Sequence, residues 1–79
     1  MRIEIYSKEL CGYCLMAENL AQELVKNNSD NSYVKLMLDK DFTVDELLEK
    51  FPNAKTFPQI TLDGNHIGGY NDFYGYLYG

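Results

Sequence analysis

Cys11 and Cys14 stand at the spacing Cys-x-x-Cys and are the only cysteines of the chain. The residues before them alternate between polar and apolar, as in a strand, and those after them have helical spacing. In a small protein, such a pair at a strand-to-helix junction indicates a dithiol redox centre. The unpaired N–H groups and the positive dipole end of a first helical turn stabilise a thiolate, which is the attacking species. The second cysteine, one turn further on, can close a disulfide with the first.

Two other uses of a Cys-x-x-Cys pair fit this chain less well. Structural zinc takes four ligands, whereas the chain offers two cysteines and one distant histidine, His66. A purely structural disulfide would close a loop of about four residues and remove little entropy from the unfolded chain. We therefore expect redox chemistry at these thiols and no metal site.

Composition limits the partners and the compartment. The 79 residues predict a single domain, residues 1–79, near the lower size at which a hydrophobic core suffices. A net charge of −5, with the seven Lys and Arg residues scattered, argues against nucleic acid or a membrane surface as partner. The start resembles no signal peptide, and no apolar run approaches the roughly 20 residues of a membrane span. Two cysteines rather than a larger framework favour a reducing, cytoplasmic location.

The elements that must position the cysteines follow from hydrophobic spacing. Residues 2–6 predict a strand with Ile3 and Ile5 on one face. Residues 13–27 predict a helix whose apolar side is formed by Ala17, Leu20, Ala21, Leu24 and Val25. Residues 33–38 predict a second strand, with Val34, Leu36 and Leu38 on one face. A strand, a helix and a returning strand indicate a parallel pair joined by a right-handed crossover.

The second half predicts a helix, a hairpin and a last helix. Thr43 and Glu46 form the pattern of an N-terminal capping box, with a buried stripe of Leu47, Leu48 and Phe51 behind it. Residues 59–62 and 65–68 flank Asp63-Gly64, a strong signal for a two-residue hairpin turn. Asn71 is the expected cap of a final helix through Leu77, packed down by Phe73 and Leu77. The expected fold is therefore α/β, a four-stranded mixed sheet with three helices in the order β-α-β-α-β-β-α.

Motifs along the whole chain resemble those of a glutaredoxin, with its thioredoxin-like fold. Lys8 lies three residues before Cys11, Cys11-Gly12-Tyr13-Cys14 matches the active-site motif, and Thr56-Phe57-Pro58 matches the proline loop. The segment from Asp63 to Asp72, with its Gly68-Gly69 pair, matches the hairpin and the glutathione-binding turn. That turn distinguishes glutaredoxins from other Cys-x-x-Cys proteins. The compact chain is similar to small dithiol members from bacteria and phages.

The resemblance implies a role for each matching residue. Cys11 would be the nucleophile and Cys14 the resolving thiol, with Tyr13 a wall of the substrate groove. Pro58 would be cis, so that the backbone of Phe57, after Thr56, pairs with the cysteinyl part of glutathione. The ends of glutathione would meet Lys8, through its glycyl carboxylate, and Asp72, through its γ-glutamyl ammonium. Gly69 would allow close approach of the ligand, and Asn71 would offer a backbone N–H to a carboxylate.

Plain structural roles remain open for several of these residues. Lys8 can be a solvated loop residue, Asp72 a first-turn acid, and the glycine pair only a turn. His66 is read as a strand residue without a catalytic role, and Tyr70, Tyr74, Tyr76 and Tyr78 as packing and surface residues.

Three positions depart from the usual glutaredoxin pattern. Gly12 replaces a proline, which restores an N–H that is expected to reach the Cys11 thiolate. Phe57 replaces a typical valine and predicts a larger apolar wall beside Pro58. Asn71 stands where threonine, serine or aspartate is frequent.

The resemblance implies a glutathione-dependent thiol–disulfide oxidoreductase. Its partners would be glutathione and disulfide-bonded or glutathionylated proteins, with ribonucleotide reductase a client by analogy, and the chain is expected to be a monomer. The alternative is a carrier of a [2Fe–2S] cluster, held between two chains by the first cysteine of each and two glutathiones. Gly12 is compatible with that use, whereas the retained Cys14 favours dithiol reduction. Recycling by a flavoprotein reductase, as in thioredoxins, is a third hypothesis, against which the glutathione turn argues.

Overall fold

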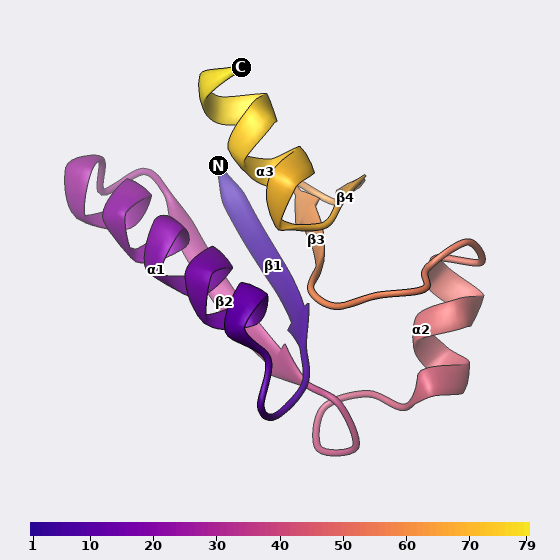
Figure 1. The fold of residues 1–79 in the computed structure, drawn as a ribbon. Helices are drawn as coiled ribbons and strands as arrows, with labels where there is room; N and C mark the ends of the chain where they lie inside the picture. The colour runs from indigo at the N-terminus through magenta and orange to yellow at the C-terminus, as the bar shows by residue number, and fades with distance from the viewer.

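The computed structural model describes residues 1–79, and the expected order of elements is confirmed (Figure 1). The elements are β1 (Arg2–Ser7), α1 (Gly12–Asn27), β2 (Ser32–Met37), α2 (Val44–Lys50), β3 (Gln59–Leu62), β4 (Asn65–Gly68) and α3 (Tyr70–Tyr78). None of the three helices has the length and apolar character that crossing a bilayer requires.

The strands form one mixed sheet in the order β2-β1-β3-β4. β1 and β2 are parallel, as the strand-helix-strand pattern predicts, and the two other pairs are antiparallel. A register shift between Ile60 and Thr61 interrupts the pairing of β3 with β4. In Figure 1, α1 and α3 lie in front of the sheet, whereas α2 stands apart from both.

The sheet separates two groups of buried side chains. The larger group lies under α1 and α3 and consists of Ile3, Ile5, Ala17, Ala21, Ile60, Leu62 and Phe73. The smaller group includes a residue of α2 and consists of Tyr6, Phe42, Leu47 and Phe51. Because neighbouring residues of a strand point to opposite faces, Ile5 and Tyr6 of β1 belong to different groups. The prediction that Ile3 and Ile5 lie on one face of this strand is confirmed.

Two turn signals in the sequence give the structure that they predict. The hairpin strands end at the expected residues, and Asp63 and Gly64 both have positive φ, 51° and 84°, as a type I′ turn requires. Thr43 Oγ1 accepts from the Glu46 N–H at 3.2 Å, while Glu46 Oε1 accepts from the Thr43 N–H at 2.9 Å. α2 therefore begins with a complete capping box.

Two predictions for the helices are wrong. Leu48 does not belong to the buried stripe of α2: its side chain is exposed, and only Leu47 and Phe51 are buried. The final helix begins at Tyr70 after Gly69, so Asn71 lies inside its first turn and is not the cap. The reason is Asp72 in the first turn, whose Oδ2 accepts from the Gly69 N–H at 3.0 Å and so gives this N–H at the helix start a partner.

Candidate active site

The two cysteines lie at the beginning of α1 and are joined by a disulfide, with their Cα atoms 5.2 Å apart. Cys11 is the N-cap residue of the helix, in an extended conformation with φ −123° and ψ 104°. Its Sγ accepts a hydrogen bond from the Cys14 N–H at 3.2 Å. The sulfur thus takes the place that a serine or aspartate oxygen usually takes at a helix start, where negative charge is stabilised.

The two sulfurs differ strongly in exposure. Cys14 is 1% exposed, beneath the first turn of α1, whereas Cys11 is half-buried and open to solvent. The loop from β1 brings Cys11 to this position through Leu10, which has φ 53° and a fully exposed side chain. An incoming sulfur can therefore reach Cys11 directly, whereas Cys14 is placed to react with Cys11.

Gly12 does not supply the donor that the sequence predicted for the Cys11 sulfur. The hydrogen bond to Sγ comes from Cys14, and the N–H of Gly12 has no acceptor within the protein. The reason is the geometry of an N-cap, whose side chain bonds to the second or third helical residue rather than to the first.

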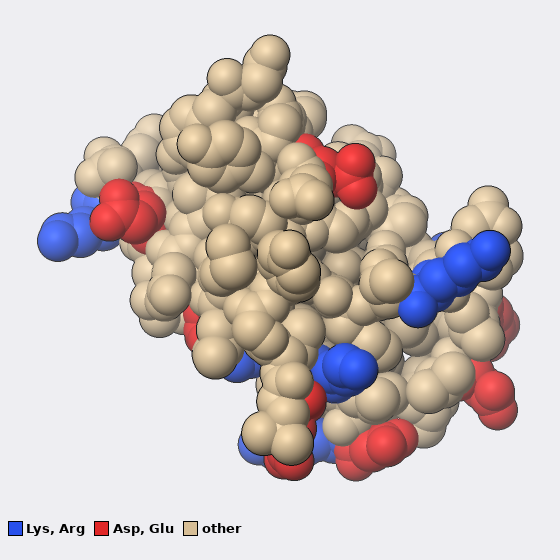
Figure 2. Space-filling view, viewed as in Figure 1, with Lys and Arg blue, Asp and Glu red and all other residues tan.

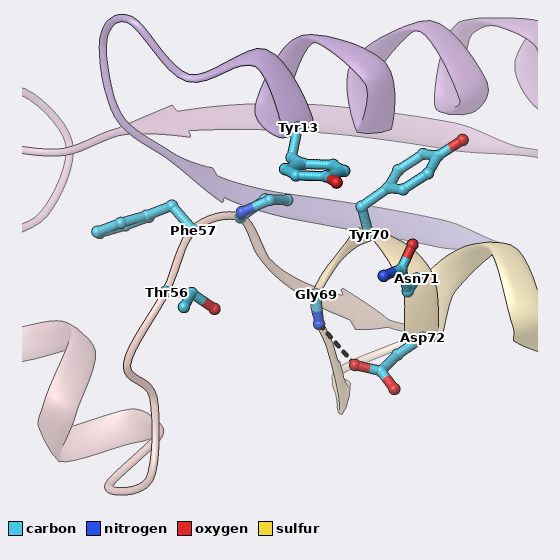
Figure 3. Close-up of a pocket in the computed structure, with 8 residues that line it drawn as sticks. Tyr13, Thr56, Phe57, Gly69, Tyr70, Asn71 and Asp72 are labelled. Carbon is cyan, nitrogen blue, oxygen red and sulfur yellow. Dashed lines mark hydrogen bonds between the residues drawn. The ribbon is translucent and has the colours of Figure 1, made fainter.

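A pocket of about 370 Å³ opens beside Tyr13, the residue that precedes Cys14 in the sequence (Figure 3). Its lining comes from α1, from the loop before β3 and from the start of α3, and consists of Tyr13, Thr56, Phe57, Pro58, Gly69, Tyr70, Asn71 and Asp72. Seven of the eight residues predicted to bind glutathione line it. Lys8, the eighth, does not. Tyr70 also lines the pocket, although the sequence predicts a packing or surface residue there; its place directly after the glycine pair is the signal that could have identified it.

The proline loop forms one wall of the pocket. The Phe57–Pro58 peptide bond is cis, as the resemblance implies. The Phe57 ring turns away from Tyr70 and Asp72 (Figure 3), and its centroid lies 6.3 Å from that of Phe42. Phe57 thus lines the pocket while its ring packs toward the aromatic group on the α2 side. Lys8 lies above this ring, with Nζ 5.8 Å from its centroid, at the outer end of the loop.

The opposite wall is the turn into α3. Gly68 has φ 117°, and a Cβ at this position would collide with the Asp72 carboxylate, so that the glycine is required there. At Gly69 an added Cβ would lie 3.5 Å from the Pro58 carbonyl oxygen, an ordinary contact distance, so the two walls come close together here. Asp72 uses one oxygen for the Gly69 N–H, and its second oxygen makes no hydrogen bond within the protein.

A buried amide connects the proline loop to the hairpin. Gln59, 5% exposed, donates through Nε2 to the Thr56 carbonyl oxygen at 2.8 Å, and its Oε1 lies 2.7 Å from His66 Nε2. Because Oε1 can only accept, His66 donates through Nε2. The His66 ring is stacked on Phe51, with centroids 4.1 Å apart. His66 thus supports the loop through Gln59 and does not touch the pocket.

No group of three or more His, Cys, Asp or Glu side chains lies together in a way that could hold a metal ion.

Comparisons with known proteins agree in pointing to one family. A family model described as Glutaredoxin matches residues 3–67. The chain is 35% identical over 75 residues to Glutaredoxin 1 of Escherichia coli strain K12, covering 92% of this chain and 88% of that protein. The structure of reduced E. coli glutaredoxin is similar with a TM-score of 0.87 at 33% identity, over 98% of this chain and 93% of that one. A buckwheat glutaredoxin–glutathione complex has a TM-score of 0.72 at 27% identity, over 92% and 64% of the two chains.

Proposed function

From the premise that the chain belongs to the glutaredoxin family and is a glutathione-dependent thiol–disulfide oxidoreductase, we propose how its residues divide the work. Cys11 is the attacking sulfur, Cys14 the resolving one, and the pocket beside Tyr13 binds the glutathione moiety. The observation that carries this proposal is the unequal burial of two sulfurs bonded at a helix start.

The dithiol route consists of two thiol–disulfide exchanges. The Cys11 thiolate attacks one sulfur of a substrate disulfide, forms a mixed disulfide and releases the other substrate sulfur as a thiolate. The Cys14 thiolate then attacks Cys11 Sγ, which releases the substrate fully reduced and leaves the Cys11–Cys14 disulfide. Two glutathione molecules reduce that disulfide and leave as glutathione disulfide, so that the electrons taken by the substrate come from glutathione.

Reduction of a glutathionylated protein requires only Cys11 of the two cysteines. Its thiolate attacks the glutathione sulfur, releases the protein thiolate and becomes glutathionylated itself, and a second glutathione restores it. The helix start favours the thiolate of Cys11 both as the attacking and as the leaving sulfur, because the Cys14 N–H and the helix dipole stabilise its charge.

The charges around the pocket support an extended pose for glutathione. Asp72, at one end, would accept a hydrogen bond from the γ-glutamyl ammonium through its free oxygen. The backbone N–H of Asn71 would donate to the adjacent carboxylate. Lys8 would reach the glycyl carboxylate from the far side of the loop, which requires its side chain to leave the Phe57 ring. The backbone of Phe57 would pair with the cysteinyl residue between these ends.

The roles of the two cysteines are tested by Cys11→Ser and Cys14→Ser, assayed with a glutathionylated peptide and with a disulfide-bonded protein. We expect Cys11→Ser to be inactive on both substrates, and Cys14→Ser to keep turnover of the glutathionylated peptide while losing dithiol turnover. Equal loss in both variants on the glutathionylated peptide would refute the assignment. The glutathione pose is tested separately by Asp72→Asn, which should raise KM for that peptide several-fold with little change in kcat.

The remaining partners belong to the same proposal. We propose that the chain acts as a monomer in a reducing cytoplasm, on protein disulfides for which ribonucleotide reductase is the client suggested by analogy. The retained Cys14, which dithiol reduction requires, favours reduction over the [2Fe–2S] carrier. Absorbance of the protein purified anaerobically with glutathione separates the two functions, because a cluster would give visible bands. Activity with glutathione reductase rather than thioredoxin reductase would identify the recycling system.

A further inference from the structure

Four tyrosine rings form a continuous row that begins at the active site and follows α3. The ring centroids are 6.0 Å apart between Tyr13 and Tyr70, 6.2 Å between Tyr70 and Tyr74, and 4.9 Å between Tyr74 and Tyr78. We call these four residues the tyrosine row. Its α3 members are four positions apart and therefore lie on one side of the helix.

Three of the four tyrosines in the row are exposed, whereas Tyr70 is half-buried and packs against the core group under α1 and α3. Tyr13, Tyr74 and Tyr78 are 57%, 50% and 60% exposed, and Phe73 and Leu77 pack the other side of α3 against the sheet. The surface over α3 in Figure 2 carries no Lys or Arg side chain and has an acidic group only at its edge. Tyrosines in such a row offer rigid apolar area with polar ends at low cost in side-chain entropy, which is the composition of binding surfaces.

The row is continuous with the place where a substrate bonds. Tyr13 lies between the two cysteines, and both Tyr13 and Tyr70 line the pocket. When Cys11 forms a mixed disulfide with a protein, the residues that flank the substrate cysteine must lie on the surface around this sulfur. A flanking segment that continues from the pocket along α3 meets Tyr74 and Tyr78 next.

We propose that the tyrosine row binds the polypeptide segment beside the reactive cysteine of a protein substrate, in an extended conformation with apolar side chains at alternate positions. This inference rests on the assignment of Cys11 as the attacking sulfur. Side chains on one face of an extended chain are about 6.6 Å apart, twice the rise of a strand residue. The steps from Tyr13 to Tyr70 and from Tyr70 to Tyr74, 6.0 and 6.2 Å, are close to that spacing, and the last step, 4.9 Å, is shorter. Alternate side chains can therefore pack over successive rings, and the tyrosine hydroxyls can bond to the peptide backbone.

The test uses short peptides, each with one cysteine activated as a mixed disulfide with nitrothiobenzoate. In one peptide three leucines alternate with serines beside the cysteine; in the second, of equal composition, the leucines are adjacent at the far end. Both are made with the leucines before and after the cysteine. The Cys11 thiolate attacks the peptide sulfur, and the coloured nitrothiobenzoate anion leaves. We expect the alternating peptide to react about tenfold faster in at least one orientation, the effect of one to two aromatic contacts. Equal rates in both orientations would overturn the proposal.

A matched pair of variants identifies the surface. Tyr74→Ser should abolish the preference for the alternating peptide, whereas Tyr76→Ser should retain it, since Tyr76 is 67% exposed on the same helix but outside the row. Both variants should react at the wild-type rate with the nitrothiobenzoate disulfide of cysteine alone. Loss of that reaction would point to Cys11 chemistry instead and so to the proposed function. Equal effects of the two variants on peptide preference, or a dimer in sedimentation that Tyr74→Ser dissociates without any peptide preference, would overturn the proposal.

Discussion

Replacing Gly12 by proline should stabilise the protein, and the structure permits an estimate of how much. Gly12 is the first residue of α1, a position where proline is favoured because its fixed φ is helical and its missing N–H has no helical acceptor. The Gly12 N–H makes no hydrogen bond within the protein, and a Cβ there would meet nothing within 4 Å. Cys11 has φ −123° and ψ 104°, close to the extended conformation that a following proline requires.

The gain arises in the unfolded chain, which loses the backbone freedom of glycine. Gly→Ala and X→Pro changes at compatible sites each contribute about 0.4–1 kcal/mol, so we expect about 1 kcal/mol or slightly more for Gly12→Pro. For a domain of this size, 1 kcal/mol raises Tm by about 4–8 °C. The Cys14 N–H that bonds to Cys11 Sγ remains in place, so the helix start keeps the donor that stabilises the thiolate.

Thermal and urea unfolding of the oxidised protein measure the effect, with Gly12→Ala as the control. Alanine should recover part of the gain, because it removes glycine freedom without fixing φ. A Tm that rises with alanine and falls with proline would show that Cys11 cannot adopt the required backbone conformation. Unchanged stability in both variants would refute the entropic reasoning itself.

Two further predictions concern residues outside the pocket. Thr43→Ala should lower the free energy of unfolding by about 1 kcal/mol, because it removes the hydrogen bond to the Glu46 N–H at the start of a short helix; urea unfolding measures this, and Thr43→Ser should lose little. Gln59→Leu should lower the free energy of unfolding by about 1–3 kcal/mol, since it leaves the Thr56 carbonyl and the His66 N–H without their partner. Amide hydrogen exchange should become faster in the proline loop. If the loop amides exchange as slowly as before, Gln59 does not support the loop.

Local signals in the sequence predict those parts of the fold that local interactions determine. Asp63-Gly64 allows positive φ at two successive residues, and the hairpin therefore has the expected bounds. Thr43 and Glu46 make both bonds of their box because each reaches a backbone N–H only three residues away. The helical spacing of Ala17 and Ala21 likewise identifies the side of α1 that meets the sheet.

The parts that the sequence does not predict depend on a competition between two local caps and on contacts between distant segments. Asn71 has the side chain of a typical cap, but the Asp72 carboxylate already occupies the N–H at the helix start. Phe57 turns toward Phe42, fifteen positions earlier in the sequence, and no local pattern indicates that direction. Tyr70 enters the pocket only because the loop before β3 comes to lie opposite the start of α3.

In the proposed mechanism, the difference in burial between the two sulfurs sets the order in which they react. Cys14 is buried in the first turn of α1, whereas Cys11 caps that turn and is open to solvent. The sulfur that accepts from the helix N–H is therefore also the sulfur that a substrate can reach. A substrate bonded to Cys11 would be released when Cys14 attacks Cys11 Sγ, because the Cα separation of 5.2 Å allows a disulfide within one helical turn. The direction of electron flow then depends on the relative stability of the Cys11–Cys14 and substrate disulfides, whereas the sequence of bonds formed depends on the geometry of the helix start alone.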